Sequence, residues 1–134
     1  MRGSILAACA SNEGEMLDGH FGSCERFLIY EVGAEESRLV AVRPAPGDDG
    51  TSARVRLVAD CQVVFLQSIG GPAAAKVVRA GVHPVKVPKI GPAAETLARL
   101  RESLKSPPPW LAKAMGVEAA SLAPFRELAG AGPA

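Results

Sequence analysis

The chain has 134 residues, which suits one domain with its own hydrophobic core. Its apolar fraction of 48% and formal net charge of +1 exclude an acidic disordered chain and a protein that neutralises long stretches of nucleic acid. No apolar run approaches the roughly 18–20 residues of a membrane span, so no membrane segment is expected. The three cysteines (Cys9, Cys24 and Cys61), without a signal-peptide pattern, favour free thiols and a cytoplasmic protein.

The charge is unevenly divided along the chain. Residues 1–67 carry 6 Lys/Arg and 10 Asp/Glu, whereas residues 68–134 carry 9 and 4. An acidic first half and a basic second half fit one small anionic ligand better than a long polyanion. The alternative is an uneven solvated surface without a binding role.

The first part of the chain predicts a strand followed by a hairpin. Residues 5–10 form a short apolar run typical of a buried strand, and residues 11–21 have the composition of a loop. Residues 26–32 are aromatic and β-branched, and residues 38–43 follow after a turn, so the two are expected to pair. A polar loop over residues 44–50 comes next.

Helices and strands alternate in the second part. The expected elements are a helix over 51–59, a strand over 63–66, a helix over 72–80, a strand over 82–87, a helix from 92 through 104 and a short helix over 110–115. Pro72 suits the first position of its helix, and Gly81 suits the end of it. Pro84 lacks an N–H group and disfavours a central place in a sheet.

This order of elements predicts a single-domain α/β fold. We expect a mixed sheet of about five strands, antiparallel and parallel, flanked by helices. The domain is expected to cover residues 1–116, with residues 117–134 as a helical or frayed tail.

A histidine between two glycines is the first place where chemistry is expected. His20 lies in a loop, directly after Gly19 and two residues before Gly22, with Cys24 four residues on. Glycines allow close approach to a ligand, and imidazole and thiolate are both ligands for iron. The alternatives are a structural histidine paired with Asp18 and, less favoured, a Cys–His nucleophile pair.

The turn between the strand over 63–66 and the following helix is the second place. Gly70 and Gly71 precede Pro72, and such a turn presents free N–H groups at the positive end of a helix, where anions bind. Lys76 and Arg79, in the same helix, are expected to add positive potential. A tight structural turn is the alternative, and the glycine pattern of a nucleotide site is absent.

The other histidine and cysteines are expected to be structural. His83 lies beside Pro84 in a predicted strand, and Cys9 and Cys61 lie in or next to apolar strands. The first strand offers Cys9 where a two-metal nuclease of similar strand order would need a carboxylate, so nuclease activity is disfavoured.

Three blocks of sequence resemble the dinitrogenase iron–molybdenum cofactor biosynthesis family, in particular its NifX-type members. They read LDGHFGSCERF at 17–27, IGGPAAAKVVRAGVHP at 69–84 and PPPWL at 107–111. The resemblance covers about residues 5–116. It implies a ribonuclease H-like topology without nuclease chemistry.

The resemblance also implies a non-enzymatic role as a carrier. Such a protein would bind an iron–sulfur precursor of the iron–molybdenum cofactor and pass it between a cofactor-building radical synthase, a scaffold complex and apo-dinitrogenase. His20 matches the histidine that the family favours as the cluster contact, and Cys24 is a less secure second ligand. The apparent lack of the N-terminal domain of larger relatives, and of a radical-enzyme cysteine motif, favours a stand-alone carrier.

Two other functions stay open from the sequence. One is a module that docks to apo-nitrogenase components without a cluster, through an apolar C-terminal surface (Trp110, Leu111, Met115, Leu122 and Phe125). The other is a small thiol-dependent or phosphate-handling enzyme, which would need a Cys24 thiol with a pKa near neutrality.

Overall fold

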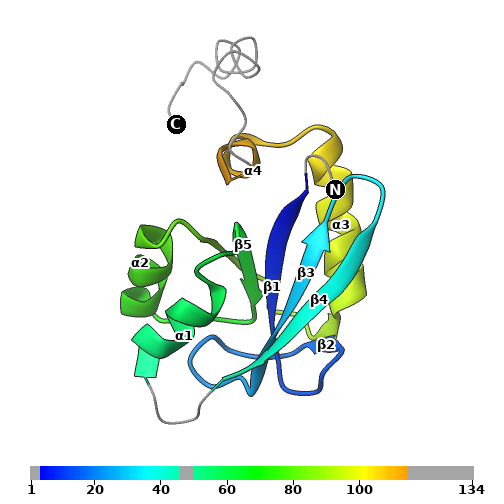
Figure 1. The fold of residues 1–134 in the computed structure, drawn as a ribbon. Coiled ribbons are helices and arrows are strands. Elements are labelled where there is room, and N and C mark those ends of the chain that lie inside the picture. The colour runs from blue at the N-terminus through cyan, green and yellow to red at the C-terminus, as the bar shows by residue number, and fades with distance from the viewer. Residues whose placement is uncertain (1–3, 46–49, 115–134) are drawn as a thin grey trace.

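Five strands form one mixed sheet at the centre of the molecule (Figure 1). The structure is a computed structural model and describes residues 4–45 and 50–114. The strands are β1 (Ile5–Ser11), β3 (Arg26–Val32), β4 (Ser37–Pro44), β5 (Val63–Leu66) and β6 (His83–Lys86). Their order in the sheet is β4-β3-β1-β5-β6. Since β3 pairs antiparallel with both β1 and β4, while β1–β5 and β5–β6 are parallel, β3 runs against its four companions.

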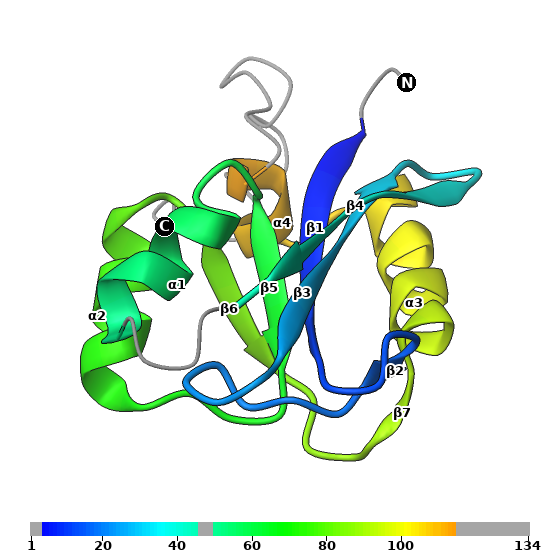
Figure 2. The ribbon, with the colours of Figure 1, turned by 60° about the horizontal axis from the view of Figure 1, so that its bottom comes forward.

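Helices cover both faces of this sheet (Figures 1 and 2). The helices α1 (Gly50–Val58) and α2 (Gly71–Arg79) pack on one face, and α3 (Ala93–Lys105) and α4 (Pro109–Ala114) pack on the other. Successive residues of β1 point to opposite faces, so Cys9 joins the core under α3 and Ala10 joins the core under α1 and α2. A strand buried on both faces reads as an unbroken apolar run, which explains the composition of residues 5–10.

A second, two-stranded sheet was not expected from the sequence. The strands β2 (Met16–Leu17) and β7 (Gly91–Pro92) pair antiparallel. Each has two residues, too few for any periodic pattern to reveal it. The N–H of Ala93 donates to the carbonyl of Glu15 (3.0 Å), so this pairing ties the loop after β1 to the start of α3.

The structure confirms the predicted element order and the mixed five-stranded sheet, with small differences at the ends. Helix α2 begins at Gly71, so Pro72 is its second residue, and Gly81 follows its end with a φ of +91°. Strand β6 lies at an edge of the sheet, as Pro84 requires. The predicted tail over residues 117–134 lies outside the described residues. None of the helices described is long and apolar enough to cross a bilayer.

Candidate functional site

The loop that carries His20 is hydrogen-bonded to the ends of two neighbouring strands. The N–H of Gly19 donates to the carbonyl of Ala10 at the end of β1 (3.1 Å), and the N–H of Gln67, just after β5, donates to the carbonyl of Gly19 (2.9 Å). The N–H of Phe21 donates to the carbonyl of Ser68 (3.0 Å). These bonds hold the His20 loop against the segment that joins β5 to α2, and Figure 2 shows the two segments passing side by side.

Gly19 allows this close approach because it has no side chain. A Cβ at this position would lie 2.6 Å from the Cβ of Cys24 and 3.0 Å from the carbonyl carbon of Ala10. A Cβ at Gly22, in the same loop, would have no neighbour within 4 Å. The two glycines thus differ in role: one is required by packing, and the other leaves the loop surface open.

The imidazole of His20 is exposed and oriented by a hydroxyl. Its Nδ1 lies 2.6 Å from Oγ of Ser68. The expected alternative, a pairing of His20 with Asp18, is not what the structure shows, because Oδ1 of Asp18 accepts the N–H of Asn12 (2.7 Å). With Nδ1 held by Ser68, Nε2 is the nitrogen left to bind a ligand. Histidine that binds metal through one nitrogen is commonly fixed by a hydrogen bond at the other.

A buried arginine supports the loop from below. Arg54 of α1 is 3% exposed, and its Nη1 donates to the carbonyls of Phe21 (3.1 Å) and Cys24 (2.9 Å). The N–H of Cys24 in turn donates to the carbonyl of His20 (2.9 Å). A buried guanidinium that bonds two carbonyls fixes the turn on which the imidazole sits. Sequence reasoning missed Arg54, although its spacing from Val58 places both on the buried side of α1.

Cys24 lies in the core rather than beside the imidazole. Its side chain is fully buried with Phe21 and Phe27 on the α1–α2 side of the sheet, and Arg54 Nη1 lies 3.5 Å from its Sγ. Burial raises the pKa of the Cys24 thiol, and the nearby guanidinium only partly offsets this. A thiol with a raised pKa and no exposed surface is not an activated nucleophile, so the structure gives no support to a thiol-dependent enzyme.

The remaining cysteines are structural, as expected. Cys9 and Cys61 are buried, and burial raises the pKa of each thiol to about 12. His83 is half-buried in β6 and stacks on Trp110 of α4, with ring centroids 4.4 Å apart. Burial lowers the pKa of His83, which indicates a neutral packed ring.

The start of α2 lies next to the His20 loop through Ser68. Gly70 is the N-terminal cap of α2, and a Cβ on Gly70 or Gly71 would meet nothing within 4 Å. This leaves open space in front of the helix N-terminus. Within the described residues, the structure records no acceptor for the N–H groups of Gly70 and Gly71.

The two predicted cations of α2 are not brought to this turn. Lys76 and Arg79 lie towards the end of the helix, and a rise of about 1.5 Å per residue places Arg79 roughly 12 Å along the axis from Gly71. Lys76 Nζ reaches Ser52 of α1 (3.4 Å). Both therefore contribute long-range positive potential rather than contacts at the turn.

The expected apolar C-terminal surface is only partly described. Leu111 is fully buried, and Trp110 is half-buried against His83, so these two side chains anchor α4 to the sheet. Met115, Leu122 and Phe125 lie outside the described residues. In residues 4–45 and 50–114, no three His, Cys, Asp or Glu side chains converge as a metal site.

Solved structures of similar shape support the fold alone. The crystal structure of the protein PH0822 matches with a TM-score of 0.63 and 17% identity, covering 72% of this chain and 88% of that one. A protein of Methanocaldococcus jannaschii matches with a TM-score of 0.58 and 13% identity, covering 75% and 91%.

Comparison of sequences gives the family. The family described as dinitrogenase iron-molybdenum cofactor matches residues 3–103. NifY of Azotobacter vinelandii is 54% identical over 120 residues, which cover 86% of this chain and 50% of that protein. NifX of Sinorhizobium fredii is 32% identical over 126 residues, covering 84% and 79%.

The match to NifY means that the chain spans half the length of that relative. The expectation of an accessory protein rather than an enzyme is confirmed at the level of the family. The glycine-flanked histidine loop and the turn before α2, which the structure joins, both lie inside the matched residues, and the chain belongs to the dinitrogenase iron–molybdenum cofactor family.

Proposed function

We propose that this chain carries an iron–sulfur precursor of the iron–molybdenum cofactor and holds it at the His20 loop. Family membership supports an accessory role in the biosynthesis of that cofactor. The finer role, binding and handing on a cluster, depends on the geometry of the loop. The observation that carries it is an exposed imidazole whose Nδ1 is held 2.6 Å from Ser68, beside the open N-terminus of α2.

In this proposal His20 Nε2 binds an iron atom of the cargo. Nδ1 then carries the proton and donates a hydrogen bond to Ser68 Oγ, which fixes the plane of the ring. The N–H groups of Gly70 and Gly71 face the anionic side of the cluster, where the positive end of α2 favours negative charge.

The weakness of this attachment is part of the proposal. A cluster held through one imidazole and a few N–H groups can be released to a partner, whereas a cage of four cysteines would retain it. Cys24 supplies packing under the loop instead of a bond to iron, because its side chain has no exposed surface. Lys76 and Arg79 add positive potential to the α2 side of the molecule.

The partners and place of action follow as proposals from the same role. A carrier of this cargo would receive it from a cofactor-building radical synthase and deliver it to a scaffold complex or apo-dinitrogenase in the cytoplasm. One relative, NifB of Bradyrhizobium diazoefficiens, bears the name FeMo cofactor biosynthesis protein and is 29% identical over 90 residues, which cover 61% of this chain and 18% of NifB. The ribonuclease H-like topology belongs to the proposal as well, supported by the mixed sheet in which β3 is reversed.

An anaerobic binding experiment tests the ligand assignment. The parent protein, His20→Ala and His83→Gln are each mixed with purified precursor cluster, and protein-bound iron and visible absorbance are measured after gel filtration. Because the chain has only two histidines, the second variant is a matched control. We expect iron retention in the parent and in His83→Gln and its loss in His20→Ala; equal retention by His20→Ala would contradict the assignment.

A pull-down, added to the absorbance measurement, separates the carrier from the docking module. A docking module would capture apo-dinitrogenase in a pull-down but show no change in visible absorbance when the precursor is added. That pair of results would replace the carrier proposal with the alternative.

A further inference from the structure

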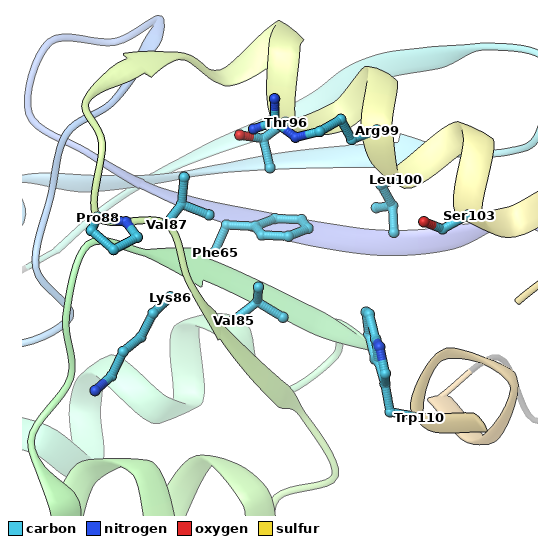
Figure 3. A pocket seen from close by; sticks show the side chains of 10 residues that line it. All are labelled: Phe65, Val85, Lys86, Val87, Pro88, Thr96, Arg99, Leu100, Ser103 and Trp110. Atoms are coloured by element: carbon cyan, nitrogen blue, oxygen red, sulfur yellow. The ribbon is translucent and has the colours of Figure 1, made fainter. Parts of the chain in front are cut away.

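A hollow of about 330 Å³ lies on the α3 side of the sheet, away from the His20 loop (Figure 3). Its apolar lining comes from four elements: Phe65 of β5, Val85 of β6, Leu100 of α3 and Trp110 of α4. These residues belong to the core cluster under α3, whereas Phe21, next to His20, belongs to the cluster under α1 and α2. The hollow and the His20 loop therefore pack against the cores on opposite faces of the sheet.

The hollow continues into a second, smaller one. The smaller hollow measures about 110 Å³ and shares Val87, Thr96 and Arg99 with the first. Together they form a groove between residues 85–92 and α3, and its larger hollow is open to solvent. Small ligands usually bury most of their surface in an enclosed cleft, so a groove of this shape better suits a short stretch of polypeptide.

Cations flank the groove on both sides. Arg99 lies on its α3 side and Lys89, in residues 85–92, lines the smaller hollow, whereas the side chain of Lys86 points away from the larger hollow (Figure 3). Among the described residues, none of these three has a recorded ion pair. The carboxylate that lines the groove is Glu95, at the smaller hollow, so the larger hollow carries the net positive potential.

The outer edge of β6 lacks one of the N–H donors that a further strand would need. Val87 and His83 donate their N–H groups inward, to Leu66 and Gln62 of the β5 side. Pro84, between them in register, has no N–H group to present at the outer edge. We therefore consider recognition through side chains that enter the groove rather than through extension of the sheet.

We propose that this groove docks an acidic segment of a partner protein, with one aromatic or large aliphatic side chain seated in the larger hollow. The apolar floor of Phe65, Leu100 and Trp110 takes the anchor, and Lys89 and Arg99 pair with carboxylates on either side of it. Interfaces of this kind draw most of their binding energy from such an anchor, while the flanking charges give specificity and speed. The groove leaves the His20 loop uncovered, so docking and cargo binding are separate properties.

The single tryptophan of the chain lines the larger hollow and reports on it directly. The probe is a synthetic, end-capped peptide with one phenylalanine flanked on both sides by glutamates. Two control peptides carry lysines in place of the glutamates, or alanine in place of the phenylalanine. We expect a saturable change in Trp110 fluorescence with the first peptide, weaker at high salt, and no saturation with either control.

Variants of the protein test the charges of the groove. Arg99→Glu should weaken binding of the acidic peptide by about tenfold or more. Arg56→Glu, an exposed arginine on α1 on the opposite face, should bind like the parent and is the matched control. Unfolding midpoints of both variants are compared with that of the parent to check that they fold. Ser103→Phe fills the hollow without changing its charge, and it should also weaken binding of the acidic peptide.

The proposal is overturned if the acidic peptide fails to saturate up to the millimolar range, or if the lysine peptide binds as tightly. Unchanged binding by Arg99→Glu and Ser103→Phe overturns it as well. If phenylacetate binds as tightly as the peptide, the hollow is a small-molecule site instead. None of these measurements includes a cluster, so their outcome is independent of the carrier proposal.

Discussion

Gly19→Ala should destabilise the protein by pushing the His20 loop off the end of β1. The new Cβ would lie 2.6 Å from the Cβ of Cys24, and both atoms are fixed to the backbone, so no side-chain rotation relieves the contact. Overpacking of this kind costs about 1–3 kcal/mol. Movement of the loop would also stretch the bonds from Gly19 to Ala10 and Gln67, each worth about 1 kcal/mol. We expect a loss of about 2–4 kcal/mol in the free energy of unfolding.

Gly22→Ala in the same loop should instead raise the free energy of unfolding. A Cβ there has open space, and Gly22 is not among the glycines with positive φ. Replacing such a glycine by alanine lowers the entropy of the unfolded chain and stabilises by about 0.4–1 kcal/mol. Urea denaturation of the parent and both variants measures the difference. Equal stability of Gly19→Ala and Gly22→Ala would refute the close packing of the loop on which the site depends.

Three further predictions concern the surroundings of the loop and α4. Ser68→Ala should keep the fold but lower retention of the precursor cluster by about tenfold, because the His20 ring loses its orientation; unchanged retention would argue against an oriented imidazole. Arg54→Met should cost about 2 kcal/mol in urea denaturation by leaving two loop carbonyls without their donor, and a change near zero would show that the arginine does not hold the turn. Burial lowers the pKa of His83 from 6.5, so at a pH just below 6.5 the unfolded chain binds more protons than the folded one. The free energy of unfolding is therefore highest above pH 6.5 and falls as the pH drops below it. His83→Gln should flatten this fall in the urea midpoint below about pH 6.5, and an identical pH profile would contradict it.

The order of elements was accessible from sequence because periodicity and turn chemistry act locally. The apolar run of β1, the hairpin of β3 and β4 and the glycine stop after α2 each depend on a few neighbouring residues. The edge position of β6 agrees with Pro84, which disfavours a central place in the sheet. The pairing of β2 with β7 did not, because two-residue strands carry no pattern and their partners are 70 or more residues apart in the chain.

The candidate site likewise combines local motifs, which the sequence shows, with long-range contacts, which it does not. The glycine-flanked His20 and the turn before α2 were each visible as local motifs. Their meeting through Ser68 is a long-range contact, 48 residues apart, that only the three-dimensional structure shows. The burial of Arg54 was hidden because arginine is ordinarily a surface residue, and its carbonyl partners lie in a distant loop. The burial of Cys24 was hidden because a thiol is chemically suited both to iron and to a core.

Nitrogen hyperfine spectroscopy of the bound cargo tests the central claim most directly. The protein is prepared with isotopically labelled histidine and loaded anaerobically with the precursor cluster in a paramagnetic state. Since His20 and His83 are the two histidines of the chain, each variant removes half of the label. The account predicts an imidazole coupling to the cluster in the parent and in His83→Gln, and none in His20→Ala. A coupling that persists in His20→Ala, or a bound cluster without any histidine coupling in the parent, would contradict it.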